Sequence, residues 1–131
     1  MDKQFNKPLF NLFYYERLNN DLEKDVGDFL RSKTQKPKDY SNDIRHQYTS
    51  AMYARNKGEN ITRKLGKLHE MLNISEGEPN NDKDKAIDLF NNDIGIEYGN
   101  RYPNVDKQQL LNMLFRDYEI NRQNRIKKLG F

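Results

Sequence analysis

The sequence predicts a single, compact all-α domain of five to six helices, packed as a bundle or in an orthogonal arrangement. Three observations support this fold class. Apolar residues recur at helical spacing in several segments, capping residues and glycines separate those segments, and no stretch shows a sustained strand pattern. A chain of 131 residues has the length of one domain, with a modest core.

The composition restricts the core and the classes of site. Only 34% of the residues are hydrophobic, so the core is expected to draw on the 7 Phe and 8 Tyr. The absence of Cys excludes disulfides and thiolate metal sites. No apolar run reaches the ~20 residues of a membrane span, so we expect synthesis in the cytoplasm, with association with a virion as an alternative destination.

Residues 1–40 are interpreted as an aromatic helical extension that serves either in docking or in the core. Pro8 suits the first turn of a helix, and the segment after it is too rich in apolar residues for a one-sided surface helix. We expect a break at residues 19–21, followed by a second helix and a loop over residues 32–39. The apolar face of that second helix is Leu22, Val26, Phe29 and Leu30.

Residues 41–100 are predicted to form the central helical core. One helix should begin at Ser41 or Asn42, run to about Asn56 and stop before Gly58. The next should span residues 61–73, followed by an exposed polar loop over residues 74–84. The apolar face expected on this helix is Ile61, Leu65, Leu68 and Leu72, with Glu70 nearly opposite.

The helix expected over residues 83–100 carries two parallel stripes. An apolar one contains Ile87, Phe90, Ile94 and Tyr98, and a polar, small one beside it contains Asp88, Asn92, Gly95 and Gly99. Each glycine costs a helix about 1 kcal/mol against Ala, which predicts close approach of a neighbouring backbone or a ligand. Asn91 is expected to hydrogen-bond to the backbone of an adjacent loop.

Residues 101–131 are predicted to contain a last helix with a basic end. Asn104 or Asp106 is suited to cap this helix. Its buried side is expected to contain Leu110, Leu111, Leu114, Phe115 and Tyr118. The basic end is either a solvated helix terminus or a contact for nucleic acid. Candidate partner-binding residues are Phe10, Phe13, Tyr14, Arg122, Arg125, Lys127 and Lys128.

Five polar residues form the candidate catalytic cluster: His46, His69, Glu70, Asp88 and Asn92. Carboxylates and imidazoles exchange protons, and an amide can orient water or a substrate carbonyl. The structural alternative is that these side chains only pair with one another inside the domain, because buried polar groups must be satisfied.

Comparison with known catalytic motifs reduces the number of reaction classes open to these residues. His69-Glu70 opens a His-Glu-x-x-His pattern, but Asn73 stands where the second His belongs, which excludes that zinc-protease motif. No cofactor is predicted; a divalent metal held by His46, His69 and one carboxylate is the alternative. Two further alternatives are a His46–Ser50 nucleophile pair and a Glu70–Asp88 acid/base pair of the glycosidase type.

Read together, His46, Gly58, Leu68-His69-Glu70 and the segment 88–95 resemble a small uncharacterised helical domain family. That family is associated with bacterial secreted or toxin-like proteins and with phage-encoded proteins. Its pattern has Ala before His-Glu and often an Arg after the last Gly, where this chain has Leu68 and Ile96. The resemblance covers about residues 44–99 and implies a shared polar pocket, with hydrolysis as the implied reaction class.

Two classes of function remain from the sequence. The first is a non-catalytic or vestigially catalytic component of a phage particle or similar assembly, docked through its aromatic N-terminal and basic C-terminal segments to protein partners. The second is a small hydrolase, acting on cell-wall or other polymeric material. In it His69 or Glu70 would be the acid/base, while Asp88 and Asn92 orient the reactants.

Overall fold

The structure, a computed structural model, describes the backbone of residues 3–72 and 82–128 and the side chains of residues 11–72 and 83–121. This part of the chain contains no strand, which confirms the all-α prediction. Its helices are α1 (Lys3–Lys33), the short 3-10 helix η1 (Pro37–Asp39), α2 (Ser41–Lys57), α3 (Glu59–Leu72), α4 (Asp82–Arg101) and α5 (Lys107–Lys128). None of the helices described is long and apolar enough to cross a membrane.

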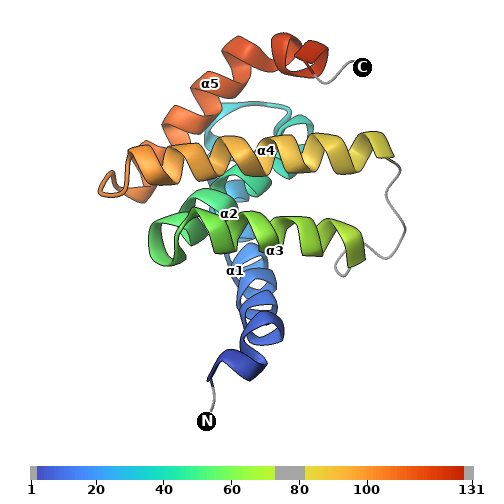
Figure 1. The fold of residues 1–131 in the computed structure, drawn as a ribbon. Coiled ribbons are helices and arrows are strands. Elements are labelled where there is room, and N and C mark those ends of the chain that lie inside the picture. The colour runs from blue at the N-terminus through green and yellow to red at the C-terminus, as the bar shows by residue number, and fades with distance from the viewer. Residues whose placement is uncertain (1–2, 73–81, 129–131) are drawn as a thin grey trace.

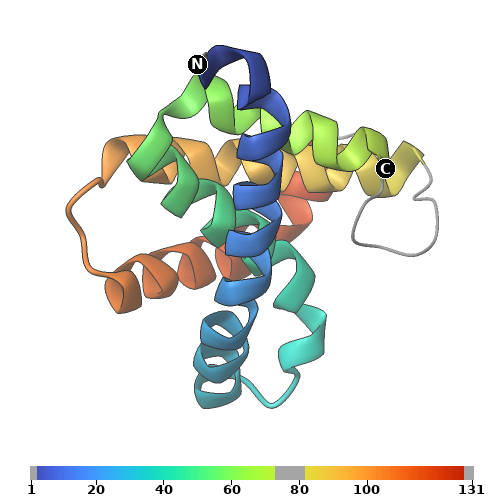
Figure 2. The same ribbon diagram turned by 90° about the horizontal axis from the view of Figure 1, so that it is seen from below.

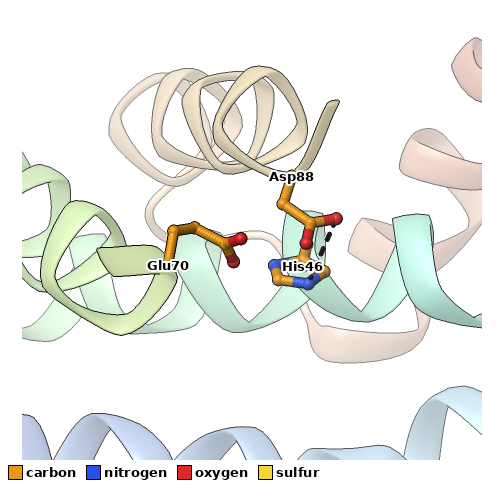
Figure 3. Close-up of side chains that lie close together, drawn as sticks. All are labelled: His46, Glu70 and Asp88. Carbon is orange, nitrogen blue, oxygen red and sulfur yellow. Dashed lines mark ion pairs between the residues drawn. The ribbon is translucent and has the colours of Figure 1, made fainter. Parts of the chain in front are cut away.

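Helix α2 is the centre of the domain and contacts every other α-helix. Helices α3 and α4 run side by side, and α1 crosses them (Figures 1 and 2). In the layered view of the site, α4 lies above α2 and α3, and α1 lies below them (Figure 3). A helix packed on several sides must be buried around its circumference, and nine residues of α2 are buried, from Ile44 to Ala54.

The break expected at residues 19–21 is wrong, because α1 continues through this segment to Lys33. Asn19 is 5% exposed, and its Oδ1 accepts a hydrogen bond from the Thr49 hydroxyl of α2 at 3.1 Å. A buried Asn with such a partner is compatible with a helix interior, whereas local sequence favours a cap or turn. The loop expected at residues 32–39 is present in part, since η1 occupies its second half.

Local signals placed the end of α2 and the start of α5 well, whereas α1 begins at Lys3, before the turn expected at Pro8. Gly58 follows α2 with φ of 95°, a left-handed conformation that favours glycine, and its N–H bonds to the carbonyl of Ala54. Asp106 caps α5, because its Oδ1 accepts the backbone N–H of Gln109 at 3.0 Å. The loop expected over residues 74–84 lies largely outside the described residues.

Two apolar clusters form the core. The larger joins α1, α2 and α5 and includes Leu30, Ile44, Tyr48 and Leu114, each fully buried. The smaller lies between the N-terminal half of α1 and helices α2 and α3, and contains Leu12, Tyr15, Tyr53 and Leu65. The candidate site lies beside the smaller cluster, since the ring centroids of Tyr15 and His69 are 6.2 Å apart.

Helices α2 and α4 meet at glycines. A Cβ added to Gly95 would lie 2.1 Å from the carbonyl oxygen of Gln47, and one added to Gly99 would lie 2.4 Å from that of Ala51. No side chain fits at such distances, so the two glycines allow the close approach of the α2 backbone. Of the two explanations left open by the sequence, a neighbouring backbone is therefore the one the structure supports.

Of the two stripes predicted on α4, the polar and small one is the more deeply buried. Ile87, Phe90, Ile94 and Tyr98 are only half-buried, while the polar and small side of the helix faces the interior. Asp88, Asn91, Asn92 and Ile96 are each at most 4% exposed. The reason lies in α2, which offers polar partners and backbone to that face.

Candidate functional site

The structure brings the five predicted site residues into one buried cluster. His46 comes from α2, His69 and Glu70 from α3, and Asp88 and Asn92 from α4. Each is between 2% and 4% exposed. The cluster lies where α2, α3 and α4 meet, and Figure 3 shows the carboxyl groups of Glu70 and Asp88 extending toward the His46 ring.

Helix α3 turns a different face inward from the one its apolar residues predict. Thr62, Leu65, Gly66, His69 and Glu70 are buried, whereas Leu72 is 52% exposed. An ideal wheel places Glu70 away from the helix's Leu-rich face, but α4 covers that side. The sequence allowed Glu70 into the site only if another element covered that side of α3, and α4 does so.

Both ring nitrogens of His46 face a polar side chain, and Nδ1 is the one that forms a hydrogen bond. Its Nδ1 lies 3.1 Å from Oδ1 of Asn92, and its Nε2 lies 3.5 Å from Oδ1 of Asp88. An amide oxygen only accepts hydrogen bonds, so Nδ1 carries the proton and Nε2 presents its lone pair. The proton on Nδ1 therefore directs the lone pair of Nε2 toward the Asp88 carboxylate.

The space around Asn92 is made by Gly66. A Cβ on Gly66 would lie 2.7 Å from Nδ2 of Asn92, which is closer than side chains normally approach. The small residue on α3 thus makes room for the α4 amide that orients His46. This pairing links all three helices of the cluster.

Asp88 is bound from two sides. Its Oδ1 accepts a hydrogen bond from Nδ2 of Asn42 at 3.2 Å, and its carboxyl group also hydrogen-bonds with Glu70. Burial raises the pKa of Asp88, while the hydrogen bonds with Glu70 and Asn42 act in the opposite direction. Asp88 therefore holds a proton more readily than an exposed aspartate.

The electrostatics of His46 favour the neutral ring. Burial lowers its pKa to about 4, and the nearby positive charge of Arg45 acts in the same direction. The hydrogen bond with Asn92 opposes this shift. At neutral pH the His46 ring is consequently an uncharged donor and acceptor in the interior.

His69 pairs with Glu16, a residue of α1 that sequence reasoning did not select. Nδ1 of His69 pairs with the Glu16 carboxylate, and Nε2 of the same ring lies 3.8 Å from Oε2 of Glu70. The ring centroids of His69 and His46 are 6.1 Å apart. The two imidazoles and three carboxylates therefore form one connected cluster with contributions from four helices.

Tyr15 forms an apolar wall beside His69. Its ring packs edge-on against Tyr53, with 5.5 Å between the ring centroids. Burial raises the pKa of Tyr15 to about 12, and the negative charges of Glu16, Glu70 and Asp88 also raise it. The hydroxyl therefore stays protonated, and the ring shields the cluster from solvent.

The hydrogen-bond partner of Asn91 differs from the predicted one. Its Oδ1 accepts a hydrogen bond from Nε2 of Gln47 at 2.8 Å, so its partner is a side chain of α2 and no loop backbone is involved. Both residues are buried. The pair lies in the α2–α4 interface and outside the group of His and carboxylate side chains.

Three residues near the site were missed: Glu16, Asn42 and Gln47. Only Glu16 had a usable signal, since it is an acidic residue in the aromatic segment that precedes Leu18. Asn42 resembles an ordinary residue of a helix's first turn, and Gln47 sits between His46 and Tyr48 with no motif around it. The roles of Asn42 and Gln47 depend on which side chains of α4 lie next to them in the fold.

The candidate partner-binding residues are described only in part. Phe13 and Tyr14 are exposed on α1, by 72% and 53% respectively. The other five members of that set lie outside the described side chains: Phe10, Arg122, Arg125, Lys127 and Lys128. Of the two alternatives left open for this segment, docking or core, a core role does not apply to these two side chains, because they lie on the surface.

Polar atoms in the cluster are incompletely satisfied by the protein itself. Neither His46 Nε2 nor Asn92 Nδ2 has a hydrogen-bond partner among the described residues, although both are buried. A buried polar atom without a partner costs about 1–3 kcal/mol, and in native proteins it usually marks a ligand, ion, water or reactive group. Both atoms are therefore available to a water, an ion or a ligand.

Comparison with known proteins gives a family without an assigned activity. Residues 18–122 match the domain of unknown function DUF6973. The chain belongs to this family. The match covers most of α1 and α5, so the DUF6973 region is wider than the resemblance over residues 44–99 suggested. The comparisons found no match among curated proteins and none among solved structures.

Proposed function

We propose that this DUF6973 protein is a small hydrolase in which His69 exchanges a proton with the reacting water. The observation that supports the proposal is the Glu16–His69 pair, which faces Glu70. A carboxylate that accepts the Nδ1 proton fixes the imidazole tautomer and leaves Nε2 to exchange protons, as in other general-base pairs. A proton taken up by Nε2 faces the Glu70 carboxylate, which stabilises the charged ring.

The reaction needs few groups. His69 Nε2 removes a proton from water, the resulting oxygen attacks the scissile bond, and the same proton returns to the leaving group. Asp88 and Asn92 orient the groups around this centre. The resemblance to domains of bacterial secreted and toxin-like proteins favours a polymeric substrate, such as cell-wall material.

The test is an assay of the purified full chain on peptidoglycan and on chromogenic ester, peptide and phosphodiester substrates. A general acid or base contributes about 10²–10⁴-fold to the rate, so Glu16→Gln and His69→Gln should lower kcat to that extent. Glu23→Gln is the matched control, because it makes the same change on the exposed side of α1. Circular dichroism verifies that each variant folds.

Two results would overturn the hydrolase proposal. One is the absence of turnover by the wild type on every substrate of the panel. The other is a kcat that Glu16→Gln and His69→Gln leave unchanged. A His69→Ala and Asp88→Ala variant that only loses its fold, with no activity to lose, also argues against catalysis.

The second candidate function is that of a non-catalytic component of a phage particle or similar assembly. The exposure of Phe13 and Tyr14 favours it, because adjacent large aromatic side chains in solvent are typical of docking surfaces. A chain present at fixed copy number in purified particles supports this function, and its absence from them rejects it. Phe13→Ser with Tyr14→Ser should reduce incorporation, whereas Arg17→Ser, an exposed control on α1, should not.

A further inference from the structure

We propose that His46, Glu70 and Asp88 form a binding site for one divalent metal ion. Each offers a ligand atom, and the three atoms all lie within 4.8 Å of one another. They come from α2, α3 and α4 and are at most 4% exposed. Figure 3 shows the three side chains directed toward one common space between the helices.

The arrangement of His46 is the first argument. Asn92 fixes the proton on Nδ1, so the lone pair of Nε2 faces Oδ1 of Asp88 at 3.5 Å. Two electron-rich atoms that face each other in the interior are stabilised by a positive charge between them, which a proton or a metal ion supplies. Two ligands of a tetrahedral zinc ion, each about 2.0–2.1 Å from the metal, lie about 3.3 Å apart, close to the observed separation.

The two carboxylates are the second argument. Glu70 and Asp88 come from different helices and meet in a site shielded from water. Like charges repel strongly at low dielectric, and a divalent cation between them removes that repulsion. One neutral imidazole and two carboxylates together carry two negative charges, which balance the charge of a divalent ion.

Each ligand is also supported by a second residue. For two of the three ligands this support is a hydrogen bond: Asn92 holds the other nitrogen of His46, and Asn42 donates to Oδ1 of Asp88. Metal ligands in proteins are typically oriented by such outer contacts, which fix the tautomer and direction of the donor atom.

The donor set indicates the class of metal. One nitrogen and two oxygens, with no sulfur, fit Zn²⁺ or Mn²⁺ better than a thiolate-seeking ion. Three protein ligands leave a position for water, as in catalytic sites, and a bound water next to His69 would be the nucleophile of the hydrolase. This role of the water rests on the proposed function, whereas binding of the metal does not.

The experiment uses the tag-free full chain, stripped of metal with a chelator and then titrated with ZnCl2, MnCl2, MgCl2 or CaCl2. Isothermal titration calorimetry and the unfolding temperature give the affinity and the stoichiometry. We expect one equivalent of Zn²⁺ or Mn²⁺ per chain, together with a rise in unfolding temperature, since a ligand that binds the folded state stabilises it. Binding of Co²⁺ should produce a visible absorption spectrum typical of nitrogen and oxygen ligands.

The variants are Glu70→Gln and Asp88→Asn, which keep shape and remove one charge. Each should weaken binding at least tenfold and abolish the metal-induced rise in unfolding temperature. In the metal-free state neither should lower that temperature, because each removes a negative charge from a crowded interior. Asp93→Asn is the control, since it makes the same change on an exposed residue of α4 and should bind like the wild type.

The proposal is overturned if the wild type binds less than a tenth of an equivalent of either ion. It is also overturned if Glu70→Gln and Asp88→Asn bind as well as Asp93→Asn. Metal binding without turnover leaves this site intact and contradicts the hydrolase, while turnover that persists in chelator contradicts the role of a metal-bound water as the nucleophile. The two proposals therefore fail in distinguishable ways.

Discussion

The carbonyl oxygen of Gln47 lies against Gly95 so closely that a Cβ at that position would be 2.1 Å away. The contact involves backbone on one side, so no side-chain rotation can relieve it. It sets the distance between α2 and α4, and thereby the position of Asp88 and Asn92 opposite His46. The first prediction follows from this contact.

Gly95→Ala should lower the free energy of unfolding by about 3 kcal/mol or more, because the added methyl forces the two helices apart. The matched control is Gly27→Ala on α1, where a Cβ would meet only the flexible Arg31 side chain at 3.2 Å. That variant should be neutral or stabilise by up to about 1 kcal/mol, through helix propensity. Urea denaturation measures both, and equal effects would contradict the close approach.

The second prediction concerns the tautomer of His46. In metal-free protein at neutral pH, Nδ1 should carry the proton and Nε2 should be bare, because Asn92 offers an oxygen to Nδ1. Two-bond proton–nitrogen correlation spectra distinguish the two nitrogens, and the chain has only 2 His to assign.

Asn92→Ala should convert His46 to a mixture of tautomers. Asn100→Ala, on the exposed side of the same helix, should leave the spectrum unchanged. A wild-type ring with its proton on Nε2 would show that the assigned orientation of the Asn92 amide is wrong.

The third prediction is a pH dependence of stability in the presence of chelator. The pKa of His46 falls from 6.5 to about 4 on folding, so between these values the unfolded chain binds the proton and the folded chain does not. The free energy of unfolding should therefore decrease as the pH falls through this window, by about 3 kcal/mol from His46 alone.

Asp88 changes the free energy of unfolding in the opposite direction as the pH falls. Its raised pKa means that the folded state takes up a proton first, so lowering the pH toward 4 stabilises the fold through this group. His46→Gln isolates the histidine contribution, because all other groups are common to both proteins. If the wild type and His46→Gln lose stability equally between pH 6.5 and 4, His46 is not a buried neutral ring.

The fourth prediction addresses the Gln47–Asn91 hydrogen bond in the α2–α4 interface. Each single alanine variant leaves the other buried amide without its partner and should cost about 1–3 kcal/mol. The double variant should cost less than the sum, with a coupling of about 1 kcal/mol. The control combines Gln47→Ala with Gln108→Ala, a change of an exposed residue on α5. The stability effects of these two substitutions should add to within about 0.5 kcal/mol.

The sequence predicted those features that depend on local chemistry. Gly58 and Asp106 mark helix ends through backbone conformation and capping, and these act within a few residues. The five polar site residues could also be found, because an acid and an amide four apart on a helix with glycines are unusual choices for packing alone.

The features that could not be predicted from local sequence depend on partners distant along the chain. Asn19 is tolerated within α1 because Thr49 satisfies it, and the inward face of α4 is polar because α2 supplies Gln47 and His46. Hydrophobic periodicity assumes that the apolar side of a helix faces the core. In α4 the small and polar stripe is the more deeply buried, so periodicity alone does not identify the inward face of this helix.

The continuity of α1 has a practical consequence for work on this family. The matched region begins at residue 18, within a helix that starts at Lys3 and brings Glu16 to His69. A fragment trimmed to residues 18–122 would keep Asp88 and both histidines, yet it would lose Glu16 and the Tyr15 ring beside it. Inactivity of such a fragment would result from the removal of these two residues and would not describe the full chain. Fragments for functional work should therefore retain the helix from well before Leu12.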